Sequence, residues 1–190
     1  MKNRKNMGCR IKGRMQLGAW AELYFMVLAM SQGLRVSSPY GGFAFYDVGV
    51  EGSTGPILRV QVKCTGHLCR DGGYAISVSV TDGPNGRRRG YAPGTVDFFA
   101  FYLIPTDDWY IVPYEVIGNR KAHLQFRPHY KRQKYGQYQE AWHLLLNASK
   151  SKHEGPIDIR ACCDEAETAG ARKLMQPPAV RRMFRGVFQE

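Results

Sequence analysis

The chain has 190 residues, 44% of them hydrophobic and 12% aromatic, so it can build a packed core and is not wholly disordered. Lys and Arg number 27 against 16 Asp and Glu, and the resulting net charge of +11 favours polyanionic partners. The longest apolar stretch, residues 19–30, is too short for a membrane span and contains Glu22. Five cysteines, an odd number, and the absence of a signal-peptide pattern predict a reduced, intracellular (cytoplasmic) protein with no membrane contact.

The elements can be predicted in chain order from hydrophobic periodicity. Residues 1–15 are expected to be a basic N-terminal arm. Apolar residues at helical spacing predict a helix over residues 16–32, and because most of its sides are apolar we expect it to be mostly buried. Further on, the sequence predicts strands over 34–37, 45–50, 57–64, 74–80, 95–104 and 109–113, and a closing helix over 137–147. The domain is expected to span 16–148, with 149–190 as a C-terminal extension that is partly disordered.

Positive charge is concentrated in three segments. Residues 1–14 and 118–135 each hold six Lys or Arg and no acid, and an Arg triplet lies in a loop rich in Gly and Pro. Such side chains neutralise phosphates, while the interleaved aromatic residues offer stacking faces, although a solvated basic face remains the alternative for any one cluster. The candidate nucleic-acid contacts are Arg87, Arg88, Arg89, Arg120, Lys121, Lys131, Arg132 and Lys134.

Polar groups occur at positions where apolar residues are expected. Glu22 is the only charged residue between Arg14 and Arg35, and a buried carboxylate needs a cation or a hydrogen-bond donor. Asp47 lies in the predicted strand 45–50. In the next strand, alternation places Gln61 and Lys63 on one face, and antiparallel pairing of the two strands would bring Asp47 beside them.

Together these residues have the chemistry of a hard-cation site beside an ammonium group. Mg²⁺ prefers oxygen ligands and can bridge to a phosphate oxygen. A metal ion lowers the pKa of a coordinated water, and Lys63 could orient that water or stabilise charge on the phosphate. The set is therefore suited to phosphodiester hydrolysis.

Asp47, followed fourteen residues later by Gln61-Val62-Lys63 and preceded by Glu22 on a helix, resembles the PD-(D/E)xK nuclease superfamily. More narrowly, the pattern is similar to the group I intron-associated homing endonucleases, in which glutamine replaces the second acid to give a PD-(D/Q)xK motif. The stretches 96–100, 109–113 and 138–145 support this likeness.

The resemblance implies an α/β fold with a restriction-endonuclease-like core, a mixed central β-sheet flanked by helices. It also implies magnesium-dependent endonuclease cleavage of double-stranded DNA by a homo-oligomer, a dimer or a tetramer. Carried over by position, Asp47 and Gln61 would ligate the metal, Lys63 would handle the nucleophilic water, and Glu22 would support the metal site. Tyr46 stands where the motif has proline, and the neutral Gln61 amide should make Glu22 more important.

Other interpretations remain open. The enzyme could be a structure-selective nuclease similar to Holliday-junction resolvases, or the chain could be a DNA-binding protein with an inactive site. Glu22 could instead pair with Arg35, and Asp97 could be structural or contact DNA. Half of a zinc site is suggested by Cys64, His67 and Cys69, which Cys162 and Cys163 could complete.

Overall fold

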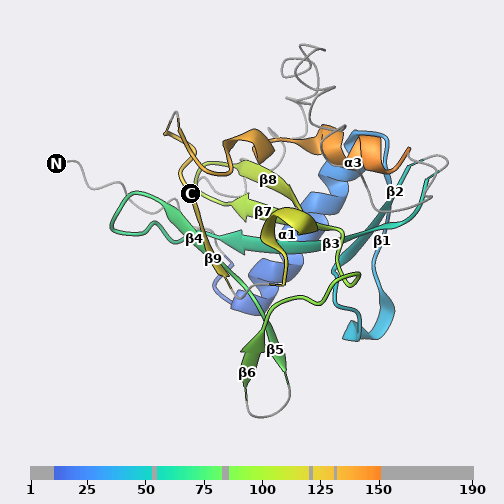
Figure 1. The fold of residues 1–190 in the computed structure, drawn as a ribbon, viewed down its shortest axis with the longest axis horizontal. Helices are drawn as coiled ribbons and strands as arrows, with labels where there is room; N and C mark the ends of the chain where they lie inside the picture. Colours follow the sequence, from blue (N-terminus) through green and yellow to red (C-terminus); the bar gives the residue numbers. More distant parts are fainter. Residues whose placement is uncertain (1–10, 53–54, 83–85, 120–121, 131, 151–190) are drawn as a thin grey trace.

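The structure, a computed structural model, describes residues 11–52, 55–82, 86–119, 122–130 and 132–150 (Figure 1). Most of the expected basic arm and nearly all of the expected C-terminal extension therefore lie outside the described residues. No helix in the described ranges is long and apolar enough to cross a membrane. The elements in chain order are α1 (Arg14–Ser31), β1 (Arg35–Ser37), η1 (Tyr40–Gly42), β2 (Val48–Glu51), β3 (Leu58–Thr65), β4 (Tyr74–Val78), β5 (Val80–Asp82), β6 (Arg87–Arg89), β7 (Phe98–Leu103), β8 (Asp108–Pro113), α2 (Tyr114–Ile117), β9 (Ala122–Phe126), η2 (Gly136–Tyr138) and α3 (Trp142–Ala148).

The centre of the fold is a five-stranded mixed sheet in the order β1-β2-β3-β7-β8. Neighbouring strands are antiparallel except β3 and β7, which run parallel. Two further strand pairs, β4-β9 and β5-β6, form separate two-stranded sheets. In the chain, β4, β5 and β6 lie between β3 and β7, and β9 follows β8. The expected α/β fold with a mixed central sheet is confirmed.

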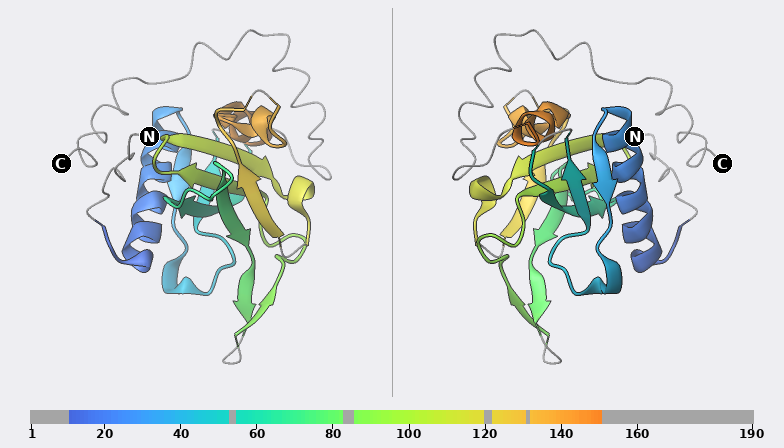
Figure 2. Two further views of the ribbon diagram at one scale, coloured as in Figure 1. Left: turned by 90° about the vertical axis from the view of Figure 1, so that its left-hand side faces the viewer. Right: turned by 90° about the vertical axis from the view of Figure 1, so that its right-hand side faces the viewer.

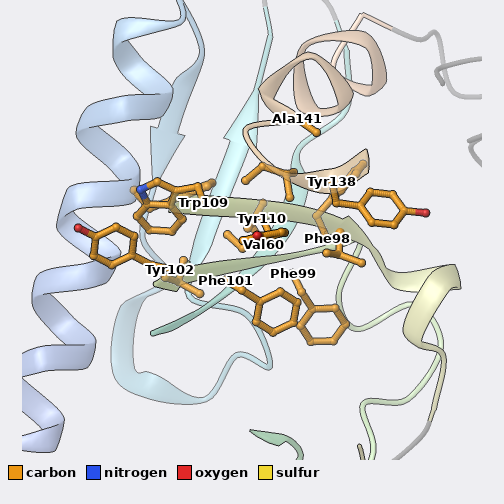
Figure 3. Close-up of a cluster of buried hydrophobic side chains, with 14 of the residues drawn as sticks. Val60, Phe98, Phe99, Phe101, Tyr102, Trp109, Tyr110, Tyr138 and Ala141 are labelled. Atoms are coloured by element: carbon orange, nitrogen blue, oxygen red, sulfur yellow. The ribbon is translucent and has the colours of Figure 1, made fainter. Parts of the chain in front are cut away.

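Strands β7 and β8 are buried on both faces of the sheet, which explains why the β7 sequence is apolar throughout (Figure 3). On one face, Tyr102 and Trp109 stack with ring centroids 4.6 Å apart, and Tyr24 of α1 packs against both. On the other face, the Phe101 and Tyr110 rings lie 5.1 and 4.7 Å from the ring of Phe126 in β9. The central strands β7 and β8 are therefore covered by α1 on one face and by the β4-β9 pair on the other.

The expectation that α1 is mostly buried is wrong. Its inner side chains, such as Phe25 and Leu28, are buried, but Leu23 and Met30 are each 60% exposed. A single helix packed on a sheet can bury only one stripe, and the apolar residues of the outer stripe stay at the surface in the described part of the chain.

Two other predicted elements differ in extent. The closing helix is interrupted at Glu140, which has a left-handed φ of 53° and separates η2 from α3. The Glu140 carboxylate accepts hydrogen bonds from the backbone N–H of Trp109 and from Nε1 of Trp142, so bonds to β8 and α3 replace those of a continuous helix. The expected strand 74–80 is likewise divided, because its first part pairs with β9 and its end pairs with β6.

Candidate active site

Strand register brings Asp47 and Gln61 together. Val48 lies opposite Val60 in the antiparallel β2-β3 pair, so Asp47, one residue before β2, lies opposite Gln61. The backbone N–H of Val62 donates to Asp47 Oδ2 at 2.8 Å, and Gln61 Nε2 donates to the same oxygen. No donor among the described residues reaches Asp47 Oδ1 or Gln61 Oε1, and both atoms remain available as ligands.

Lys63 occupies the same face of β3 as Gln61, two residues further on. It is half-buried, and its Nζ lies 5.9 Å from the centroid of the Tyr91 ring. Burial lowers the pKa of Lys63, and the charges of Asp47, Cys64 and Glu22 partly offset this effect. Among the described residues no direct ion pair links Lys63 to a carboxylate.

Glu22 approaches from α1, between buried Ala21 and exposed Leu23. Burial raises the pKa of Glu22, the negative charge of Asp47 raises it further, and Lys63 lowers it. Its carboxylate makes no hydrogen bond or ion pair with a described residue, so its link to the site is through the charges of Asp47 and Lys63. The alternative pairing with Arg35 is wrong, because the Arg35 guanidinium contacts Glu51 at 3.4 Å and the Gly52 carbonyl at 2.9 Å.

The donor set fits a divalent cation. Burial raises the pKa of Asp47, although the Val62 N–H, Lys63 and Gln61 all act to lower it. The charged forms of the Asp47 and Glu22 carboxylates are disfavoured by burial, and Asp47 is hydrogen-bonded to the Gln61 amide, so these three side chains are the ones that could hold a cation. In the described ranges no three His, Cys, Asp or Glu side chains are grouped closely enough to hold a metal ion.

The structure also tests the suggested half zinc site of Cys64, His67 and Cys69. Neither Cys64 nor Cys69 forms a disulfide, and together with His67 they form no metal-binding group among the described residues. Cys162 and Cys163 lie outside the described residues.

Asp97 has a structural role. Its carboxylate accepts from the Arg59 side chain at 2.8 and 3.0 Å and from the Arg59 backbone N–H at 2.7 Å. This bidentate, partly exposed pair joins the start of β3 to the residue preceding β7.

The basic residues predicted to contact nucleic acid lie in separate parts of the structure. Arg87, Arg88 and Arg89 are exposed, and they form strand β6 of a hairpin rather than part of an irregular loop. Arg132 and Lys134 are also exposed, while Arg120, Lys121 and Lys131 lie outside the described residues.

Sequence reasoning missed Tyr91. Its ring is 4% exposed, packs edge-on against Phe99 and lies beneath the Lys63 ammonium group. Burial, together with the charge of Asp47, raises the pKa of Tyr91 well above its usual value. No sequence spacing could have revealed this contact, because it depends on where the chain returns to the sheet after the β5-β6 hairpin.

Comparison with known proteins agrees with this geometry. Residues 14–145 match the sequence model of the PD-(D/E)XK endonuclease family, and the chain belongs to this family of nucleases. A similar solved structure is that of I-Ssp6803I, a bacterial homing endonuclease. It is 27% identical, with a TM-score of 0.61 over 74% of this chain and 100% of that chain. No curated protein matches the sequence. The expected resemblance to the superfamily and to its homing-endonuclease branch is confirmed.

Proposed function

We propose that the protein is a magnesium-dependent endonuclease that cleaves double-stranded DNA at a specific sequence, as homing endonucleases do. The observation that carries the proposal is the shared face of Asp47, Gln61 and Lys63, with Glu22 coupled to it from α1. Family membership supports nuclease chemistry, and the similarity to a homing endonuclease supports sequence-specific duplex cleavage.

Asp47 and Glu22 would hold the metal through carboxylate oxygens, and Gln61 through its amide oxygen. When bound, magnesium would polarise the scissile phosphate and lower the pKa of the attacking water. The site residues act on the same atoms: Lys63 orients the water for in-line attack and stabilises negative charge that develops on the phosphate. Tyr91 covers one side of Lys63 and limits its contact with solvent.

We also propose that the enzyme works as a homo-oligomer. Two copies related by a two-fold axis would place one site on each strand of a pseudo-palindromic target. Sedimentation of the protein with and without duplex DNA would measure this assembly.

Plasmid cleavage by Lys63→Ala tests the catalytic proposal. We expect wild-type protein to nick or linearise, in magnesium but not in calcium, a supercoiled plasmid that carries a duplex sequence the protein binds specifically. Lys63→Ala should be slower by about 100-fold or more, because it lacks the ammonium group that stabilises the transition state. Duplex binding in calcium should remain, since the exposed arginines are unchanged.

If wild type and Lys63→Ala both bind duplex and neither cuts plasmid in magnesium, the protein binds DNA without cleaving it. Cleavage of four-way junctions with linear duplex spared would instead support a structure-selective nuclease.

A further inference from the structure

Three aromatic residues are exposed together on the loop between β1 and β2. Tyr40 and Phe43 are 101% and 91% exposed, and Phe45 is 43% exposed. Gly41 has a φ of 82°, and a Cβ there would lie 3.1 Å from the Phe43 ring, so the turn that carries the two outer rings requires glycine. Large apolar groups gathered at a surface usually mark a contact site.

The β5-β6 hairpin carries positive charge on a fixed base. Arg87, Arg88 and Arg89 are all exposed along β6. Immediately after them the chain returns to the domain: a Cβ on Gly90 would lie 2.5 Å from the backbone of Asn119, and the carbonyl of Tyr91 accepts a 2.9 Å hydrogen bond from the Tyr114 hydroxyl. The arginines are therefore held out from the domain on an anchored strand pair.

The loop and the hairpin meet at one end of the molecule. The Arg89 guanidinium carbon lies 5.6 Å from the centroid of the Phe45 ring, within cation–π range. Figures 1 and 2 show η1 and the β5-β6 hairpin projecting in the same direction, away from α3. Both segments lead directly into the candidate active site, because Asp47 follows Phe45 by two residues and Tyr91 follows Arg89 by two.

The arginine side chains and the aromatic side chains bind different parts of DNA. Guanidinium groups bind phosphates, whereas aromatic rings gain nothing from phosphates and pack instead on sugars and base faces. In a fully stacked duplex the base faces are hidden, but apolar side chains can enter the minor groove and open a base step, which bends the duplex.

We propose that Tyr40 and Phe43 form an aromatic wedge that packs on bases at an opened step of the DNA duplex, while Arg87, Arg88 and Arg89 hold the adjacent backbone. This inference rests on the proposed function, because it concerns how the same enzyme holds its DNA. The wedge opens the duplex close to the phosphate that is cleaved.

Binding of two DNA probes tests the wedge. One probe is a fully paired duplex and the other has the same sequence with a central two-base mismatch, both measured in calcium so that DNA is not cut. We expect wild type to favour the mismatched probe and the double variant Tyr40→Ala/Phe43→Ala to lose that preference. Its affinity for the mismatched probe should fall by about 10-fold, with an unchanged dependence on salt, since stacking involves no counterion release.

Arg88→Ala is the matched charge variant. It should weaken binding to both probes and reduce the slope of log affinity against log salt by about 0.9, the value for one phosphate contact. Leu23→Ala, which shortens an exposed apolar residue on α1, should behave as wild type. The melting temperature of the aromatic double variant should also match wild type, because both rings are exposed.

Equal binding of the two probes by wild type, or an unchanged probe preference in Tyr40→Ala/Phe43→Ala, would overturn the wedge. A change in sedimentation with unchanged DNA binding would also overturn it and would identify the loop as a contact between copies. Plasmid cleavage by wild type is scored separately, so failure of the wedge and failure of the nuclease proposal give different results.

Discussion

At the residue scale, the candidate site is built from ionisable side chains whose charged forms are destabilised by burial. Burial raises the pKa of Asp47 and Glu22 and lowers the pKa of Lys63, so all three are disfavoured in their charged forms. Functional sites commonly combine such groups, because a bound metal or substrate supplies the charge that the protein alone does not.

We expect Asp47→Asn to stabilise the metal-free protein. A folded-state pKa above the unfolded value means that the contribution of Asp47 to stability is fully present below its ordinary pKa and is lost as the pH rises through the raised value. The free energy of unfolding of Asp47→Asn should therefore exceed that of wild type at pH 7, and by a smaller margin at pH 4. Urea unfolding with a chelator present, repeated across this range, measures the difference.

Magnesium should reverse that ranking, since an ion bound only to the folded state stabilises it. Asp97→Asn is the matched control at a carboxylate that is paired with Arg59. It should lower the unfolding free energy by about 1–3 kcal/mol, because hydrogen bonds to a charged group are lost. Equal effects of the two Asn substitutions would contradict the argument.

At the element scale, the loop between β2 and β3 is held against the end of α3. A Cβ on Gly55 would overlap the carbonyl oxygen of Ser149, a residue that is fully buried. The neighbouring Gly52 approaches the same residue, with 2.9 Å between its ideal Cβ and that oxygen. The close packing of Gly52 and Gly55 in the connection between β2 and β3 thus requires glycine.

A pair of Gly→Ala substitutions tests this packing. Gly55→Ala should lower the unfolding free energy by about 1–3 kcal/mol, because the backbone of Ser149 must move. Gly18→Ala, in α1 with nothing within 4 Å of its Cβ, should raise it by roughly 0.5–1 kcal/mol through helix propensity. Thermal unfolding of both variants gives the comparison, and a neutral result for Gly55→Ala would show that the loop can retreat at little cost.

At the scale of the whole molecule, the two aromatic layers of the sheet hold α1 and the β4-β9 pair in place. Trp109 is fully buried and touches rings from α1, β7 and α3, those of Phe25, Tyr102 and Trp142 among them. The position of Glu22 relative to β3 therefore depends on this layer.

Trp109→Ala should cost about 3–5 kcal/mol of unfolding free energy, a large part of the roughly 5–15 kcal/mol typical of a domain. Leu23→Ala, at a side chain that is 60% exposed, should change it by less than about 0.5 kcal/mol. Denaturant titration followed by circular dichroism separates the two, and similar midpoints would mean that the Trp109 layer contributes little to stability.

The local pattern of the sequence was sufficient to predict α1, the central strands, the contact of Asp47 with Gln61 and the position of Lys63 on the same face of β3 as Gln61. The helix follows from helical periodicity, and the site residues follow from alternation along one strand and from pairing between strands that are neighbours in the chain. All of these are short-range properties. The motif also predicted the family, since its spacing follows from the same β2-β3 pair.

Tertiary structure alone decided the features that join distant segments. Four features depend on how separate elements pack. They are the position of Tyr91 under Lys63, the pairing of β9 with β4, the exposed outer stripe of α1 and the contact of Phe45 with Arg89. The break at Glu140 has the same origin, because bonds to Trp109 and Trp142 replace those of a continuous helix. Such contacts follow from how separate elements cover the central strands, and a local sequence pattern carries no information about which distant surface will cover them.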